Sequence, residues 1–230
     1  IIMILLFIGI IAIMSPNDEV IIKDNSILKI DLANTLVVER KSENPLDLLN
    51  ISGEIQEVIA LKDILDNIEK AKKDKKIKAI YINTSFINAG LSQIEEIRNK
   101  LLEIKKTKKP IIAYAEVYSQ SAYYLASIAD KIYLNPVGVV ELKGLSISQL
   151  FFTGLLDKLD IEMQIIRHGK FKSAVEPYTL EKMSSENREQ MTLLLNSISN
   201  NIMDSIASQR GFSLAKIQEH ANNLSLENAK

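Results

Sequence analysis

Short apolar runs alternate with longer amphipathic segments through most of this 230-residue sequence, and this alternation restricts the fold more than any other feature. The apolar runs predict strands at 77–83, 110–115, 131–134 and 161–166. Segments with apolar residues three and four positions apart predict helices at 59–73, 91–106, 119–127 and 149–159. Strands separated by helices in this way are typical of an α/β protein with mainly parallel pairing.

The two ends of this pattern follow the same rules. Residues 26–32 alternate well enough for a further strand, whereas 34–53 is polar and predicts an irregular connection. The longest helical pattern begins at Ser184 and extends to about Gln209. The Ser184 side chain can cap the unpaired backbone N–H groups of the first turn. Gly211 is the residue expected to end that helix.

Composition excludes several kinds of site. The net charge is −1, so nothing indicates a nucleic-acid partner. The chain has no cysteine, so it can form neither a disulfide nor a thiolate metal site. Its two histidines, His168 and His220, are too far apart in the sequence to give a metal-ligand spacing. We therefore predict no metal and no cofactor.

Residues 1–14 are apolar and carry no charge. At 1.5 Å per residue they extend about 21 Å, less than the ~30 Å core of a bilayer. Because the sequence begins with isoleucine, we expect upstream residues to complete a membrane-spanning anchor at 1–16 that contacts lipid through 1–14. The alternatives are the apolar region of a signal peptide, although no small-residue cleavage site follows, or a buried helix. The acidic Asp18 and Glu19 favour translocation of the rest.

The stretch 168–178 places lysines among apolar residues in the order His-Gly-Lys-Phe-Lys-Ser-Ala-Val-Glu-Pro-Tyr. A buried, unpaired ammonium is costly, and the lysine relieves that cost by losing its proton. Acting as a base near neutrality requires a pKa lowered by roughly 3 units, or about 4 kcal/mol, which desolvation can supply. Lys172 is therefore a candidate general base. The alternative is a surface lysine whose stem lies over Phe171.

Three motifs in order give the sequence a family resemblance. They are Tyr-Ser-Gln-Ser-Ala-Tyr-Tyr-Leu-Ala-Ser at 118–127, Leu-Asn-Pro-Val-Gly-Val-Val at 134–140, and Lys-Ser-Ala-Val-Glu-Pro-Tyr at 172–178. From about 61 to 206 the sequence resembles the signal peptide peptidase A family of membrane-bound serine proteases with a serine/lysine dyad. It is most similar to the amino-terminal half of the long, two-repeat members, which brings the lysine while the other half brings the serine.

The resemblance implies a fold and a division of the chain. Residues 59–230 are expected to form a crotonase-like spiral of βαβ units, shared with the caseinolytic protease core. This repeat would carry Lys172 as its catalytic residue. Residues 17–58 would form strands and an irregular connection between the membrane anchor and the repeat.

Two departures from the family pattern affect the nucleophile and the oxyanion site. The family's serine precedes the paired tyrosines, and Gln120 occupies that position here. Ser121 lies one residue further along and would need a shift of register to serve instead. The loop 84–90 has one glycine and a bulky Phe-Ile pair where the family has paired glycines, which gives poor backbone approach to a carbonyl oxygen. We therefore expect this segment alone to be inactive.

Glu176 and Ser173 lie close to Lys172 in the sequence. A carboxylate beside the lysine would stabilise the ammonium, so Glu176 is interpreted as a structural or interface hydrogen-bond partner. Pro177 follows it and predicts an extended backbone at Glu176. Ser173 is a candidate for orienting the lysine amine.

The resulting hypothesis is a homo-oligomeric, membrane-anchored serine endopeptidase half-domain on the periplasmic side of a bacterial inner membrane. It would degrade cleaved signal peptides or other membrane-derived peptides, with Lys172 as base for a serine from a second repeat or subunit. The alternative is a non-catalytic, protease-like scaffold in a membrane assembly. An acyl-CoA enzyme of the crotonase fold explains neither residues 1–14 nor the lysine motif.

Overall fold

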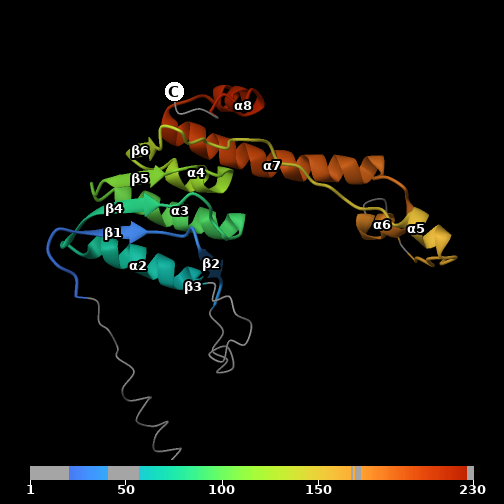
Figure 1. Ribbon diagram of the computed structural model, residues 1–230, viewed down its shortest axis with the longest axis horizontal. Coiled ribbons are helices and arrows are strands. Elements are labelled where there is room, and N and C mark those ends of the chain that lie inside the picture. The colour runs from blue at the N-terminus through green and yellow to red at the C-terminus, as the bar shows by residue number, and fades with distance from the viewer. Residues whose placement is uncertain (1–20, 41–56, 167, 169–171, 227–230) are drawn as a thin grey trace, which may run out of the picture.

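The computed structural model describes residues 21–40, 57–166, 168 and 172–226, which form an α/β fold with two parallel sheets (Figure 1). The larger sheet has the strand order β1-β4-β5-β6, and the smaller one pairs β2 with β3. The strands are β1 Ser26–Ile30, β2 Thr35–Val38, β3 Glu57–Ala60, β4 Ile77–Asn83, β5 Ile111–Ala115 and β6 Lys131–Leu134. All the pairings of these strands are parallel.

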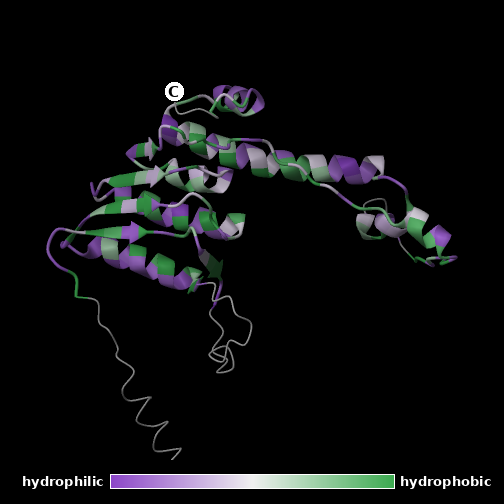
Figure 2. Cartoon of the chain, in the orientation of Figure 1, coloured by the Kyte–Doolittle hydropathy of each residue, from purple (hydrophilic) through white to green (hydrophobic). Residues whose placement is uncertain are grey.

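The core lies between the larger sheet and the helices that connect its strands. These helices are α2 Leu61–Lys73, α3 Leu91–Lys105 and α4 Gln120–Ala126, which pack side by side in that order. Ile80 and Ile82 of β4 are fully buried in the same core cluster as Ile97 and Leu101 of α3. Figure 2 shows that the strands carry mainly hydrophobic residues, whereas the helices carry both hydrophobic and hydrophilic residues. β-Branched residues on strands and apolar residues at helical spacing explain this layering.

The long helix α7 Ser185–Arg210 belongs to two parts of the structure. Near its end, Ile202, Met203 and Ile206 are buried in the core, and α8 Leu214–Asn222 packs against it. Its first half instead projects beyond the sheet together with α5 Thr153–Lys158, the 3-10 turn η2 Ser173–Val175 and α6 Glu176–Thr179 (Figure 1). We call this projection, made of the described residues between 145 and 195, the arm.

Most of the predicted elements are confirmed. The strands at 77–83 and 131–134 have the expected bounds, and the predicted strand at 110–115 begins one residue later. The Ser184 hydroxyl accepts the Asn187 backbone N–H at 3.1 Å, as an N-cap should. Gly211 ends α7 with φ 71°, a left-handed conformation that glycine adopts without steric cost.

Three predictions about single segments are wrong. Residues 161–166 form no strand, since no strand among the described residues lies beside them to pair with. The helix predicted at 149–159 is confined to 153–158, because the Phe152 backbone N–H is taken by Pro177 O at 2.7 Å. The connection predicted at 34–53 begins with β2, which finds a partner in β3.

Parts of two further predictions lie outside the described residues. The apolar segment 1–14 and Phe171 are among the residues left undescribed. Within the described ranges, no helix is both long enough and apolar enough to cross a membrane.

Candidate active site

Two of the three sequence motifs meet at the carboxyl edge of the larger sheet. The backbone of Tyr118 pairs with the segment after β6, donating to Val139 O at 2.9 Å and accepting from Glu141 N at 2.8 Å. The Ser119 N–H donates to Ser85 O at 3.0 Å, which fixes the loop after β4 beside the start of α4. Loops at this edge of a parallel sheet are the usual place for a binding site.

The start of α4 is where the family pattern expects a nucleophile. The Ser119 side chain caps the helix by accepting the Ala122 N–H at 3.3 Å. The Gln120 side chain accepts the Lys143 backbone N–H at 2.9 Å. This hydrogen bond fixes the segment that directly precedes the arm. Ser121 is half-buried. Ser119 and Gln120 therefore have structural partners, and neither of these two hydrogen bonds is with a basic side chain.

The loop 84–90 is held from two sides. The Thr84 hydroxyl donates to Phe86 O at 3.0 Å, and Asn88 O accepts the Val37 N–H of β2 at 3.0 Å. The Phe86 side chain remains 57% exposed at this edge. The loop is therefore tied to the smaller sheet and presents a large side chain.

The paired tyrosines after Ser121 belong to the core. Tyr124 is buried, and the Arg98 guanidinium lies 4.9 Å from its ring centroid. Burial raises the pKa of Tyr123, and it raises the pKa of Tyr124 although Arg98 partly opposes the shift. Both phenols therefore remain neutral near pH 7, which fits packing better than acid–base chemistry.

The third motif lies on the arm. Lys172 is exposed and directly precedes η2. It lines an open hollow of about 690 Å³ beside the first half of α7. The other lining residues are Ile166, His168, Ser173, Ala174, Val175, Gln190 and Met191. The structure thus places Lys172 with Ser173 in one hollow.

Lys172 is far from the start of α4 in the same chain. It shares its hollow with Gln190 of α7, whereas the part of α7 buried in the core begins at Ile202. These twelve residues of helix correspond to about 18 Å, against the roughly 3 Å of a catalytic hydrogen bond. Figure 1 shows the same separation between α6 and α4. The structure therefore does not bring Lys172 together with Ser121 or Gln120.

Glu176 is a buried hydrogen-bond acceptor, only 1% exposed. Its carboxylate accepts from the Ser184 hydroxyl at 2.5 Å and from the Asn187 side-chain amide at 2.8 Å. Its interpretation as a structural partner is confirmed. The predicted extended backbone is wrong, because Glu176 has φ −54° and ψ −37° and begins α6. Proline is well tolerated in the first turn of a helix, and these hydrogen bonds hold the turn in place.

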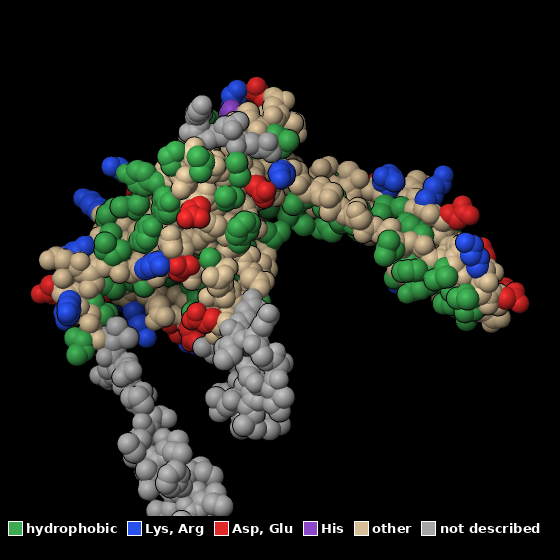
Figure 3. All heavy atoms as spheres, viewed as in Figure 1, with side chains coloured by type: hydrophobic (Ala, Val, Ile, Leu, Met, Phe, Trp, Pro, Cys, Tyr) green, Lys and Arg blue, Asp and Glu red, His purple; other side chains and the backbone are tan. Residues whose placement is uncertain are grey.

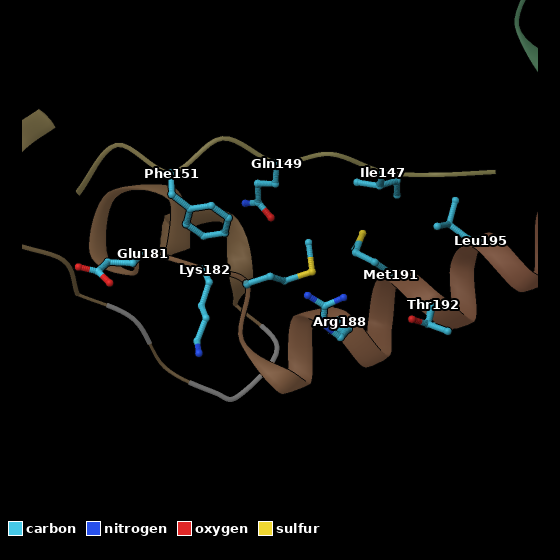
Figure 4. A pocket seen from close by; sticks show the side chains of 10 residues that line it. Ile147, Gln149, Phe151, Glu181, Lys182, Arg188, Met191, Thr192 and Leu195 are labelled. Carbon is cyan, nitrogen blue, oxygen red and sulfur yellow. The ribbon is translucent and has the colours of Figure 1, made fainter. Parts of the chain in front are cut away.

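A second hollow on the arm was not foreseen from the sequence. It has a volume of about 320 Å³ and lies between the segment 147–151 and α7 (Figure 4). Phe151 and Gln149 line one side, and Met191 and Leu195 of α7 line the other. Met191 and Leu195 lie on one face of α7 at helical spacing, and Gln149 and Phe151 alternate along the facing segment. These spacings are also those of ordinary packed residues, so they did not mark a hollow in the sequence.

Comparison with known proteins gives one family and several relatives. The model of "Peptidase family S49" matches residues 103–230, more than half of the chain. "Protease 4" of Haemophilus influenzae is 38% identical, over 76% of this chain and 29% of that protein. "Protease 4" of Salmonella typhi is 32% identical over 81% of this chain and 31% of that protein. The chain thus spans under a third of the length of these relatives.

Solved structures give a weaker comparison. An enoyl-CoA hydratase/isomerase family protein from Silicibacter pomeroyi matches 72% of this chain and 85% of its own, at 12% identity and a TM-score of 0.30. A score this low adds nothing to the α/β fold described above. The crotonase-like spiral therefore stays a prediction.

Proposed function

Because the chain belongs to peptidase family S49, we propose that it is the lysine-bearing half of a serine endopeptidase. Lys172 acts as the general base, and the nucleophilic serine comes from a second repeat or another subunit. The substrates are cleaved signal peptides or other membrane-derived peptides. One observation carries the proposal: Lys172 lies on an arm that projects away from the sheet edge of its own chain.

The chemistry requires a neutral amine beside a serine hydroxyl. The amine takes the hydroxyl proton as the oxygen attacks the peptide carbonyl, and N–H donors hold the resulting oxyanion. Lys172 is exposed in this chain, so the partner must exclude water from it. Desolvation then favours the neutral form of the lysine. The loop 84–90 is a poor oxyanion site, which makes the partner the source of those donors as well.

The surface of the arm supports such a partner. Figure 3 shows hydrophobic side chains gathered along the arm. Those at least half exposed include Leu150, Leu155, Leu159, Ile166 and Leu193. Isolated exposed leucines are ordinary, but a contiguous group indicates a contact surface. A homo-oligomer, or a second repeat packed on the arm, would cover it.

The proposal places the protein at a membrane. The uncharged residues 1–14 support an anchor at 1–16 that contacts lipid, with the remaining residues on the periplasmic side of a bacterial inner membrane. Peptides left in the bilayer after signal cleavage would reach such an enzyme by diffusing within the membrane.

Hydrolysis of an apolar peptide by the full-length protein tests the role of Lys172. The substitution Lys172→Ala should lower kcat by about 10²–10⁴-fold, the usual contribution of a general base. Lys182→Ala is the matched control, since Lys182 is also an exposed lysine on the arm. Turnover retained in the Lys172→Ala variant would remove this residue from the mechanism.

A non-catalytic scaffold is the second candidate function. Gln120 at the expected nucleophile position and the exposed Phe86 favour it. A full-length wild-type protein that binds an apolar peptide and leaves it intact would support the scaffold over the peptidase.

A further inference from the structure

The buried carboxylate of Glu176 holds the lysine-bearing segment against the start of α7. One oxygen, Oε1, accepts the Ser184 hydroxyl at 2.5 Å. The other, Oε2, accepts the Asn187 side-chain amide at 2.8 Å and the Ser184 backbone N–H at 3.3 Å. These donors are uncharged and lie at the positive end of a 26-residue helix. That position stabilises a carboxylate and offsets part of the cost of burying it.

The same donors connect three segments of the arm. The Ser184 hydroxyl also accepts the Asn187 N–H, so it caps α7 while it donates to Glu176. The Asn187 amide, buried like Glu176, also donates to Gln149 Oε1 at 3.3 Å. The carboxylate is therefore the centre of a small polar network that joins α6, α7 and the segment before α5. Such networks hold a single arrangement when their members are satisfied.

Fixing Glu176 also fixes Lys172. The single turn η2, Ser173–Val175, separates the two residues, and Lys172 is its N-cap. At about 2 Å rise per residue this turn leaves little slack between them. On the other side, the rings of Phe152 and Tyr178 stack with centroids 5.9 Å apart, which holds α6 against the segment before α5.

We propose that Glu176 is a positioning residue for Lys172. Its carboxylate accepts hydrogen bonds from the first turn of α7. These bonds set the position of the lysine amine relative to a serine from another repeat or subunit. The inference rests on the proposed function. In this role the carboxylate accepts hydrogen bonds from the start of α7.

Steady-state peptide hydrolysis by the full-length protein tests this role. Glu176→Gln replaces one acceptor oxygen with a donor that faces other donors, so the network loosens. We expect kcat to fall by roughly 10²-fold, as for a small misplacement of a catalytic group, with KM little changed. Glu181→Gln, at an exposed carboxylate five residues further on, should leave both constants unchanged.

A second pair of variants addresses the same contact without touching Glu176. Ser184→Ala removes the hydroxyl and should lower kcat by about tenfold. Ser184→Thr keeps a hydroxyl that can cap and donate, and should restore kcat to near the wild-type value. Equal kcat values for the alanine and threonine variants would overturn the proposal.

The double variant separates positioning from a general structural role. If Glu176 acts through Lys172, then Lys172→Ala/Glu176→Gln should be no slower than Lys172→Ala alone. A further loss in the double variant, or wild-type kcat in Glu176→Gln, would overturn the positioning role. Full turnover in Lys172→Ala would instead overturn the proposed function, so the two failures are distinguishable.

Discussion

At the scale of single residues, Gly138 shows how closely the turn after β6 approaches the chain beside it. A Cβ atom at this position would lie 2.0 Å from the Glu116 carbonyl oxygen and 2.8 Å from Leu134 Cδ1. Both contacts are far inside van der Waals distance, and the first is with backbone that cannot swing away. The turn therefore requires glycine for space.

The substitution Gly138→Ala should lower the free energy of unfolding by about 3 kcal/mol, because the added methyl forces the backbone to shift. Urea unfolding of the two proteins measures the difference. Gly144→Ala is the control, since a Cβ there meets nothing within 4 Å and should change stability little. Equal midpoints for the two alanine variants would contradict the close approach.

Arg98 is a second residue whose role depends on packing. It is buried on α3, where its side chain donates to Tyr124 O at 3.2 Å and to Ser205 O at 2.9 Å. It thereby joins α3, α4 and α7, and burial lowers its pKa without removing the charge of a guanidinium. The apolar pattern of α3 identifies the buried side of the helix, but an arginine on that side could not be predicted from it.

At the scale of elements, α2 and α3 are joined by ion pairs on their outer sides. Glu69 of α2 contacts Lys100 of α3 at 2.7 Å, and Lys72 of α2 contacts Glu103 of α3 at 2.7 Å. Hydrogen bonds from Lys100, then from Lys73 and Lys72, lower the pKa of Glu69 to about 2. The folded protein therefore holds this carboxylate ionised more strongly than the unfolded chain does.

This shift predicts how stability depends on acid. Because the pKa of Glu69 in the folded protein is below the unfolded value of 4.5, the ion pairs of Glu69 stabilise the fold above about pH 4.5. This stabilisation is lost as the pH falls toward 2. Melting temperatures from pH 6 to pH 2 should show a gap between wild type and Glu69→Gln that closes with acid. High salt should narrow the gap at pH 6, since Glu69 and Lys100 are partly exposed to solvent. A gap constant across this range would contradict the account.

The helices and strands also show which sequence signals are sufficient to predict an element of secondary structure. Helix α7 was predictable at both ends, because Ser184 and Gly211 act on backbone groups a few residues away. Strand β4 was predictable because its buried isoleucines, Ile80 and Ile82, alternate with less buried residues at the period of a strand. The equally apolar run 161–166 forms no strand, because strand formation also needs a neighbour, and neighbours are set by distant parts of the chain.

At the scale of the whole molecule, the arm is the feature that the sequence did not reveal. Its exposed leucines are apolar and spaced like core residues. Periodicity alone therefore predicts that these side chains are buried within the same chain. The structure instead leaves Leu193 64% exposed. The candidate site is likewise only partly predictable: the motif identifies Lys172, but its distance from Ser121 depends on where α7 carries the arm.

If another repeat or copy covers the arm, a charge on it should weaken that contact. Leu193→Glu should therefore shift the full-length protein toward smaller assemblies or a less compact form, because a buried, unpaired carboxylate is costly. Light scattering with size-exclusion chromatography measures the change. Val137→Glu, at an exposed residue in the turn after β6, should leave the elution unchanged. Identical behaviour of the two variants would exclude Leu193 from any contact.

The proposed pairing of Lys172 with a serine outside its own sheet edge can be tested most directly by labelling. A phosphonate that reacts with activated serines, applied to the full-length protein, should modify one serine other than Ser121. The same reaction should be lost in Lys172→Ala and retained in Lys182→Ala. Modification of Ser121, or undiminished labelling in the Lys172→Ala variant, would contradict the account.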